Sequence, residues 1–238
     1  MTGITPLGGL AATSFIFVFL SLMSVSGTVA FIIIVIANRA DPDPTGKRPV
    51  ASYFFGGAFV TLWLTVIGVL VSIFSLVGLI GANNHGGFFS SELHPATDAA
   101  IRGITIGLLL VVIAGFAHVA HARRGLQLSG SEEDPASPTK RVERGYLAVV
   151  SFIAVVVTIF AGFATVYIVL GFIAPGVYHG GTSMSQTKAL LDALTVLVVF
   201  AGVFYTHQRL VSPGLRLIEP KATTPSAPVE LTGGAASE

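Results

Sequence analysis

The stretch Tyr53–Ile80, YFFGGAFVTLWLTVIGVLVSIFSLVGLI, decides the fold class of this chain. It contains no charged residue, and it exceeds the roughly 20 apolar residues that a helix needs to cross the hydrocarbon core of a bilayer. A segment inside a membrane must satisfy its backbone N–H and C=O groups internally. The stretch is therefore expected to be a transmembrane helix, although its Val and Ile content would favour a strand in water.

The whole chain has the composition of a membrane protein. Of its 238 residues 53% are hydrophobic and 11% are charged, whereas soluble domains carry about 25% charged residues. Apolar segments of about 18 residues or more occur five times: Ala11–Ala37, Pro49–Ile80, Ala99–Ala120, Gly145–Ile173 and Lys188–Tyr205. The sequence predicts an all-α integral membrane bundle of five transmembrane helices. A net charge of +1 without a basic patch argues against nucleic-acid binding, and the absence of cysteine excludes disulfides and thiol chemistry.

The cations predict the orientation of the helices. Eleven of the 13 follow the first, third and fifth apolar segments: Arg39, Lys47, Arg48, Arg123, Arg124, Lys140, Arg141, Arg144, Arg209, Arg216 and Lys221. The positive-inside rule then places the N-terminus outside and the C-terminus in the cytoplasm.

Two parts of the chain repeat the same landmarks in the same order. A Lys-Arg pair precedes Tyr53 and Tyr146, His-Gly-Gly follows the apolar run at His85 and His179, and a His-x-Arg motif closes each part at His121 and His207. We predict one leading helix with its cytoplasmic turn (1–46), two parallel duplicated hairpins (47–124 and 140–210), a cytoplasmic linker (125–139) and a disordered cytoplasmic tail (211–238).

The repeated unit resembles an uncharacterised bacterial two-helix membrane domain that is often present in tandem. The residues that carry the resemblance are Arg48 and Tyr53, Arg141 and Tyr146, His121 and Arg123, and His207 and Arg209. The resemblance implies a multi-pass protein of the bacterial plasma (inner) membrane, and it implies no activity.

The closing histidines are candidates for a cofactor site. His121 and His207 would lie at equal depth on facing helices, as axial ligands of a b-type haem do, and His118 could replace His121. The alternative is that they are boundary residues at headgroup level, where His and Arg are common. No cofactor is the leading expectation, with haem b as an alternative.

The outer histidines are candidates for a metal site. His85, His94 and His179 could bind zinc or copper, with Glu92 and Asp98 near them in sequence. The alternative is that the His-Gly-Gly motifs only end their helices, with glycine in the cap.

Two pairs of opposite charges are expected at the outer ends of the helices. Asp98 and Arg102, and Lys188 and Asp192, are each four residues apart on one helix and can neutralise each other. Asp192 lies one turn inside its apolar segment, so a small ion channel or transporter that uses it is an alternative function.

The remaining features favour packing rather than catalysis. Small residues within the apolar segments, such as Gly103 and Gly107, allow helices to approach closely. No nucleophile–base pair or phosphate-binding loop is visible, so hydrolysis and phosphoryl transfer are not expected. The leading hypothesis is a non-enzymatic subunit of a membrane assembly or a homo-oligomer, in contact with the lipid bilayer.

Overall fold

The computed structural model describes residues 42–80, 96–134, 136–174 and 183–216, together with Val29, Phe31, Ile32 and Ile36. For residues 96–98 and 211–216 it describes the backbone alone. All regular secondary structure in these residues is α-helical, which confirms the predicted fold class for this part of the chain.

Four long helices make up the described structure. They are α2 (Arg48–Gly78), α3 (Ala96–Gly130), α4 (Pro138–Ile173) and α6 (Ser183–Arg216). All four are long and apolar enough to cross a membrane, which is compatible with a polytopic membrane protein. The fifth predicted helix, Ala11–Ala37, falls almost entirely outside the described residues.

Three helices extend beyond their predicted boundaries. The predicted linker 125–139 is helical up to Gly130 and again from Pro138, and α6 continues to Arg216, inside the predicted disordered tail. The predicted boundaries were placed where charges begin. Charges mark the edge of the hydrocarbon, whereas a helix continues into water until its backbone is interrupted or capped. At α4 the cap is Ser137, whose hydroxyl accepts from the backbone N–H of Lys140, followed by Pro138 in the first turn.

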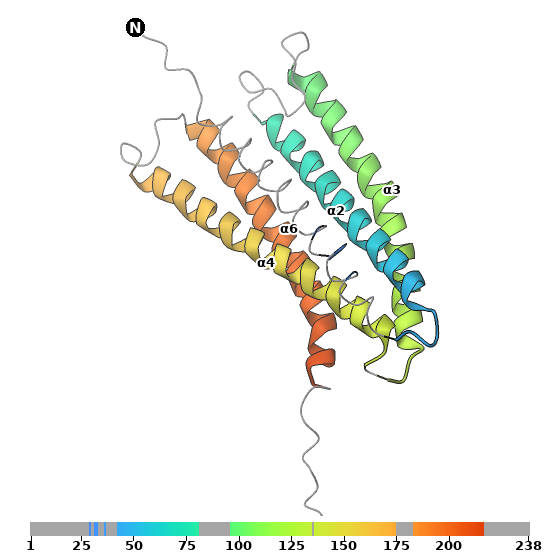
Figure 1. Cartoon of the computed structure of the whole chain (residues 1–238). Helices are drawn as coiled ribbons and strands as arrows, with labels where there is room; N and C mark the ends of the chain where they lie inside the picture. The colour runs from blue at the N-terminus through green and yellow to red at the C-terminus, as the bar shows by residue number, and fades with distance from the viewer. Residues whose placement is uncertain are drawn as a thin grey trace, which may run out of the picture.

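The helices form two hairpins (Figure 1). Helix α2 packs along α3, and α4 packs along α6. Helix α2 also contacts α4 and α6, and α3 contacts α4. The first residues of α2 and α4 and the last residues of α3 lie at one end of the bundle, which we call the basic end.

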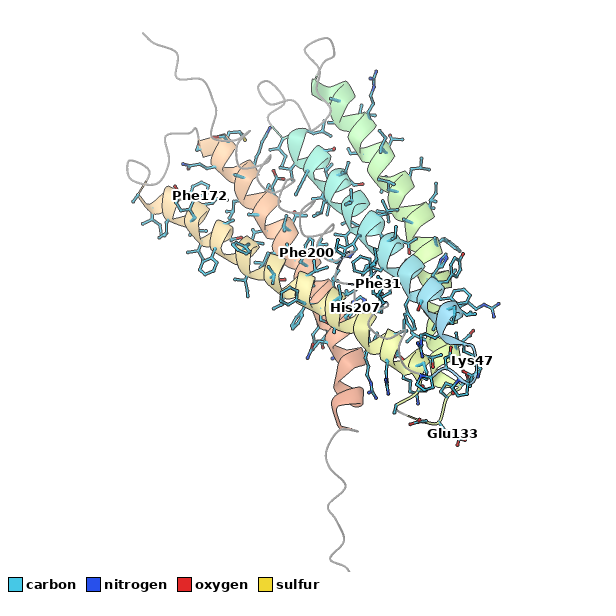
Figure 2. The ribbon with its side chains drawn as sticks, viewed as in Figure 1. Phe31, Lys47, Glu133, Phe172, Phe200 and His207 are labelled. Atoms are coloured by element: carbon cyan, nitrogen blue, oxygen red, sulfur yellow. The ribbon has the colours of Figure 1, made fainter. Side chains whose placement is uncertain are left out.

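Aromatic side chains form the seam between the hairpins. Phe55 of α2 packs on Tyr146 of α4 with ring centroids 5.4 Å apart, and Trp63 of α2 stacks on Phe200 of α6 at 5.8 Å. Phe31 stacks on Phe59 of α2 at 5.7 Å and is buried, so the leading segment also contributes to this core (Figure 2). Such ring pairs contribute about 0.5–1.5 kcal/mol each beyond the burial of their area.

Glycines set the close approach of α2 and α3. A Cβ added to Gly107 would lie 2.3 Å from the Ser72 hydroxyl and 2.6 Å from the Gly68 carbonyl oxygen, and one added to Gly68 would lie 2.7 Å from the Gly107 carbonyl oxygen. Only hydrogen fits at both positions. The predicted role of Gly107 in close helix packing is therefore realised within the first hairpin.

Candidate functional site

The opening Tyr and the closing His of the second hairpin meet in its interior. The hydroxyl of Tyr146 on α4 lies 3.3 Å from Nε2 of His207 on α6, and the rings are 5.9 Å apart in a T-shaped arrangement. Nδ1 of His207 donates to the carbonyl of Val203 at 2.8 Å. Because a carbonyl only accepts, Nδ1 carries the proton, and in the neutral imidazole Nε2 accepts from the Tyr146 hydroxyl. Both side chains are buried.

In the first hairpin, the corresponding Tyr and His side chains also lie close together. The rings of Tyr53 and His121 are 5.8 Å apart, and Nδ1 of His121 donates to the carbonyl of Ala117 one turn earlier at 2.7 Å. Gly57 leaves space for the imidazole, since a Cβ there would lie 2.5 Å from Cδ2 of His121. The difference between the hairpins is exposure, because Tyr53 is 66% exposed.

His118 joins the two helices of the first hairpin. Its Nδ1 donates across to the carbonyl of Ala58 on α2 at 2.9 Å. The three candidate haem ligands therefore all use Nδ1 in bonds to backbone carbonyls, and His207 uses Nε2 as well.

The outer candidates are only partly described. His85, His94 and His179 lie outside the described residues, as does the side chain of Asp98. Within the described residues there is no group of three or more His, Asp or Glu side chains that could hold a metal ion. The structure therefore leaves the outer metal site as a prediction.

The two charged residues near the start of α6 lie in different surroundings. Lys188 donates to the carbonyl of Gly78 at 3.3 Å, so it binds the C-terminal end of α2, where a cation is favoured by the helix dipole. No ion pair joins Lys188 to Asp192, although the structure describes both side chains. Oδ1 of Asp192 is buried and makes no hydrogen bond to any described residue. Arg102, on α3, is exposed.

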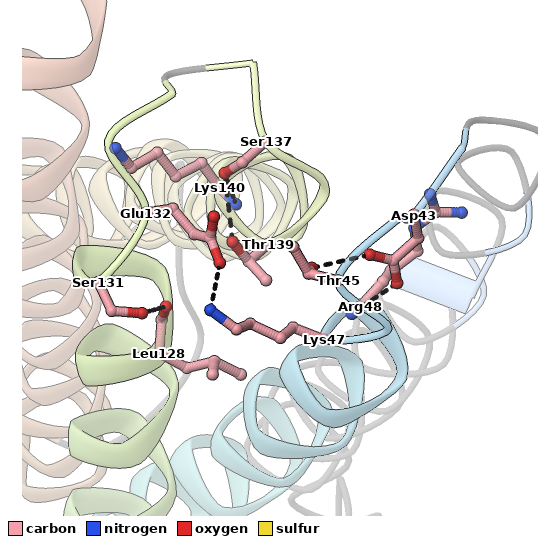
Figure 3. Close-up of polar contacts among 10 residues, drawn as sticks. All are labelled: Asp43, Thr45, Lys47, Arg48, Leu128, Ser131, Glu132, Ser137, Thr139 and Lys140. Carbon is pink, nitrogen blue, oxygen red and sulfur yellow. Dashed lines mark hydrogen bonds and ion pairs between the residues drawn. The ribbon is translucent and has the colours of Figure 1, made fainter.

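A polar contact at the basic end was not predicted from the sequence. Nζ of Lys47, just before α2, lies 2.8 Å from Oε1 of Glu132 in the connection between α3 and α4 (Figure 3). In the sequence, Lys47 contributes to the predicted orientation and to the Lys-Arg landmark of the repeat. Nothing in the spacing of two residues so far apart in the chain could have identified the pair.

Asp43 organises the turn that leads into α2. Its carboxylate accepts from the backbone N–H of Arg48 at 3.0 Å and from the Thr45 hydroxyl at 3.1 Å (Figure 3). Desolvation alone would raise the pKa of Asp43, but these hydrogen bonds and the Arg48 charge together lower it below its ordinary value. The carboxylate form therefore stabilises the start of α2.

Comparison of the chain with protein-family models, with curated proteins and with solved structures found no match.

Proposed function

We propose that this chain is a non-enzymatic polytopic membrane protein that packs as an accessory subunit in a membrane assembly or associates with itself. One observation carries the proposal: Tyr146, His207 and His118 bond within the bundle, and the outer faces of the helices carry exposed apolar side chains. Tyr146 bonds to His207 and His118 bonds to backbone, while Phe116 of α3 and Phe163 of α4 are 81% and 70% exposed. This distribution favours a protein that contacts other molecules through the exposed apolar faces of its helices.

Photocrosslinking in native membranes tests this proposal. A photoreactive residue replaces Phe116 or Phe163, and one at Phe59, which is buried in the core, is the matched control. We expect a protein adduct of discrete mass from at least one outer position, with the same protein retained on purification, and none from position 59. Lipid adducts alone at both outer positions would contradict the proposal.

We also propose that the two hairpins are tandem copies related to the bacterial domain described above, with the C-terminus in the cytoplasm of a bacterial plasma membrane. The similar Tyr–His contacts in both hairpins support the duplication. Orientation is tested with single cysteines, since the chain has none of its own. An impermeant maleimide applied to intact cells should label a cysteine that replaces Ser183. A cysteine that replaces Glu133 should be labelled only after the cells are permeabilised. The reverse pattern would mean that the orientation is inverted.

Haem b binding is a second candidate, because the buried His207 and the half-buried His118 are imidazoles within one helical bundle. Ligation by His207 through Nε2 would require that atom to leave the Tyr146 hydroxyl. The test is a reduced-minus-oxidised spectrum of protein purified in mild detergent with haem supplied during expression. Sharp α and β bands that disappear in His207→Ala would support a cytochrome, and a flat spectrum would exclude this candidate.

Ion conduction is a third candidate, supported by the buried, unbonded Oδ1 of Asp192. Protein reconstituted in liposomes should then carry an ion flux that Asp192→Asn abolishes. Wild-type liposomes without flux would eliminate this candidate.

A further inference from the structure

One outward face of α6 runs from an apolar side chain to an arginine. Val198, Gly202, Tyr205 and Arg209 follow one another at steps of four, three and four residues, and all four are exposed. These steps place residues on one side of a helix. The face therefore forms a continuous surface that is apolar toward the middle of the helix and cationic toward the basic end.

Arg209 is held in place on this face without an acidic partner. Its guanidinium lies over the ring of Tyr205, 4.4 Å from the centroid, and donates to the Tyr205 hydroxyl. The structure gives it no ion pair with any described carboxylate. The other N–H groups of its planar fork remain suited to a phosphate, which they can bind through two parallel hydrogen bonds.

Gly202 leaves the middle of the face open. A Cβ at this position would meet nothing within 4 Å. The exposed side chains of Val198 and Tyr205 lie about one helical turn before and after this open position. An acyl chain of a lipid is the bilayer component that fits there.

The distance along α6 from Lys188 to Arg209 matches the thickness of a hydrocarbon core. Lys188 and Arg209 are 21 residues apart on α6, which corresponds to about 31 Å at 1.5 Å per residue. The hydrocarbon core is about 30 Å thick. With Lys188 at one boundary, Arg209 reaches the phosphate layer at the other.

The first hairpin provides an internal comparison. Val112, Phe116, Val119 and Arg123 have the same spacing on α3, and all are exposed. There the strongly exposed ring of Phe116 stands where α6 has Gly202, and Val119 replaces Tyr205. The α3 face has the cation, but it lacks the open glycine position and the aromatic ring that supports the arginine.

We propose that the α6 face from Val198 to Arg209 binds an acidic phospholipid, with the phosphate on the Arg209 guanidinium and an acyl chain along the open helix surface at Gly202. A zwitterionic headgroup carries an ammonium group, which would need a carboxylate beside Arg209. No described carboxylate forms an ion pair with Arg209, so an acidic headgroup is preferred. This inference rests on membrane residence and is independent of the accessory role proposed above.

The test uses the full-length protein in mild detergent. Phosphatidylglycerol and phosphatidylcholine are added in equal amounts, and the bound lipid is counted by native mass spectrometry. The wild type should retain more phosphatidylglycerol; Arg209→Gln should remove that preference and lower phosphatidylglycerol retention about tenfold, the size expected for a lost charge-assisted bond. Gly202→Leu should weaken retention of both lipids. Arg123→Gln on α3 is the matched control and should stay near wild type.

Three outcomes would overturn the proposal. One is equal retention of the two lipids by the wild type. The second is an equal loss in Arg123→Gln and Arg209→Gln, because the effect would then be one of general charge. The third is release of the lipid by excess inorganic phosphate, which would mean that the arginine recognises free phosphate rather than lipid. Size-exclusion profiles of the variants verify folding, and Tyr205→Leu, which removes the support of Arg209 without changing charge, should also reduce the preference.

Discussion

The hydroxyl of Tyr146 and Nε2 of His207 lie 3.3 Å apart in the buried interior of the second hairpin, near the opening of α4 and the closing part of α6. Tyr53 and His121, the corresponding landmarks of the first hairpin, also pack ring against ring. The two motifs that repeat in the sequence therefore meet in space in each hairpin. Their side chains tie the ends of a hairpin together, with a hydrogen bond in the second hairpin.

Removal of the Tyr146 hydroxyl should destabilise the protein. Tyr146→Phe leaves Nε2 of the buried His207 without its hydrogen-bond donor. The cost of such a loss is about 1 kcal/mol, since hydrogen bonds within membrane proteins average about 0.6 kcal/mol and an unsatisfied buried group adds to this. Unfolding in mixed micelles of increasing denaturing-detergent fraction measures the change. Tyr53→Phe is the control, with an expected change under about 0.5 kcal/mol, because that side chain is exposed. Equal losses in both variants would refute the buried bond as the cause.

Alanine should have opposite effects at two glycines. Gly107→Ala places a methyl group against Ser72 and the Gly68 carbonyl, and should destabilise the protein by about 1–3 kcal/mol. The methyl group added by Gly202→Ala has no neighbouring atom within 4 Å. This substitution should stabilise α6 by up to about 1 kcal/mol, because alanine loses less backbone freedom on folding than glycine does. The same micelle titration measures both. A stabilising Gly107→Ala would mean that α2 and α3 are not in close contact there.

The ion pair between Lys47 and Glu132 should contribute little to the free energy of unfolding. The Lys47 side chain is 41% exposed, and pairs of this kind are worth about 0–1 kcal/mol. A double-mutant cycle with Lys47→Met and Glu132→Gln should give a coupling energy in that range, and the coupling should shrink at high salt. Lys140→Met serves as a control cation, with no coupling to Glu132→Gln. A coupling that is unchanged by salt would contradict this assignment.

Asp43 should make stability depend on acid pH. Its pKa in the folded protein lies below the ordinary value, so its contribution is fully present above the pKa of the unfolded chain and is lost as pH falls through the folded pKa. The side-chain carbon shift of labelled Asp43, followed by NMR in detergent, should titrate with a midpoint below about 3.9, the value in an unstructured peptide. Asp43→Asn should flatten the decline of stability below about pH 4. A midpoint at or above the peptide value would disprove the hydrogen-bonded turn.

The helical class and the position of most helices were predictable because the bilayer imposes a simple rule. A run such as Tyr53–Ile80 has no charged residue and must satisfy its backbone internally, which leaves only the helix. Helix ends were less predictable. The continuation of α3 to Gly130 depends on backbone hydrogen bonding in water, which hydropathy does not report.

For the candidate site, too, the residues could be predicted from the sequence but their partners could not. His118, His121 and His207 stood out as residue types and by their places in the repeat, yet their partners depend on which faces of the helices meet. The Ala58 carbonyl as partner of His118, and Gly78 as partner of Lys188, arise from helix packing between distant segments. A single sequence contains no pattern from which hydrogen-bond partners on different helices can be predicted.

By itself the sequence determined that the described part of this chain is helical, apolar and marked by paired landmarks, because hydrophobic length and charge act locally along a chain. Only the tertiary structure decided that α2 contacts all three other helices, that Trp63 and Phe200 join the hairpins, and that Lys47 reaches Glu132. Those contacts depend on the rotation and crossing of each helix, and these follow from how the side chains pack and from how closely the backbones approach, as at Gly68 and Gly107.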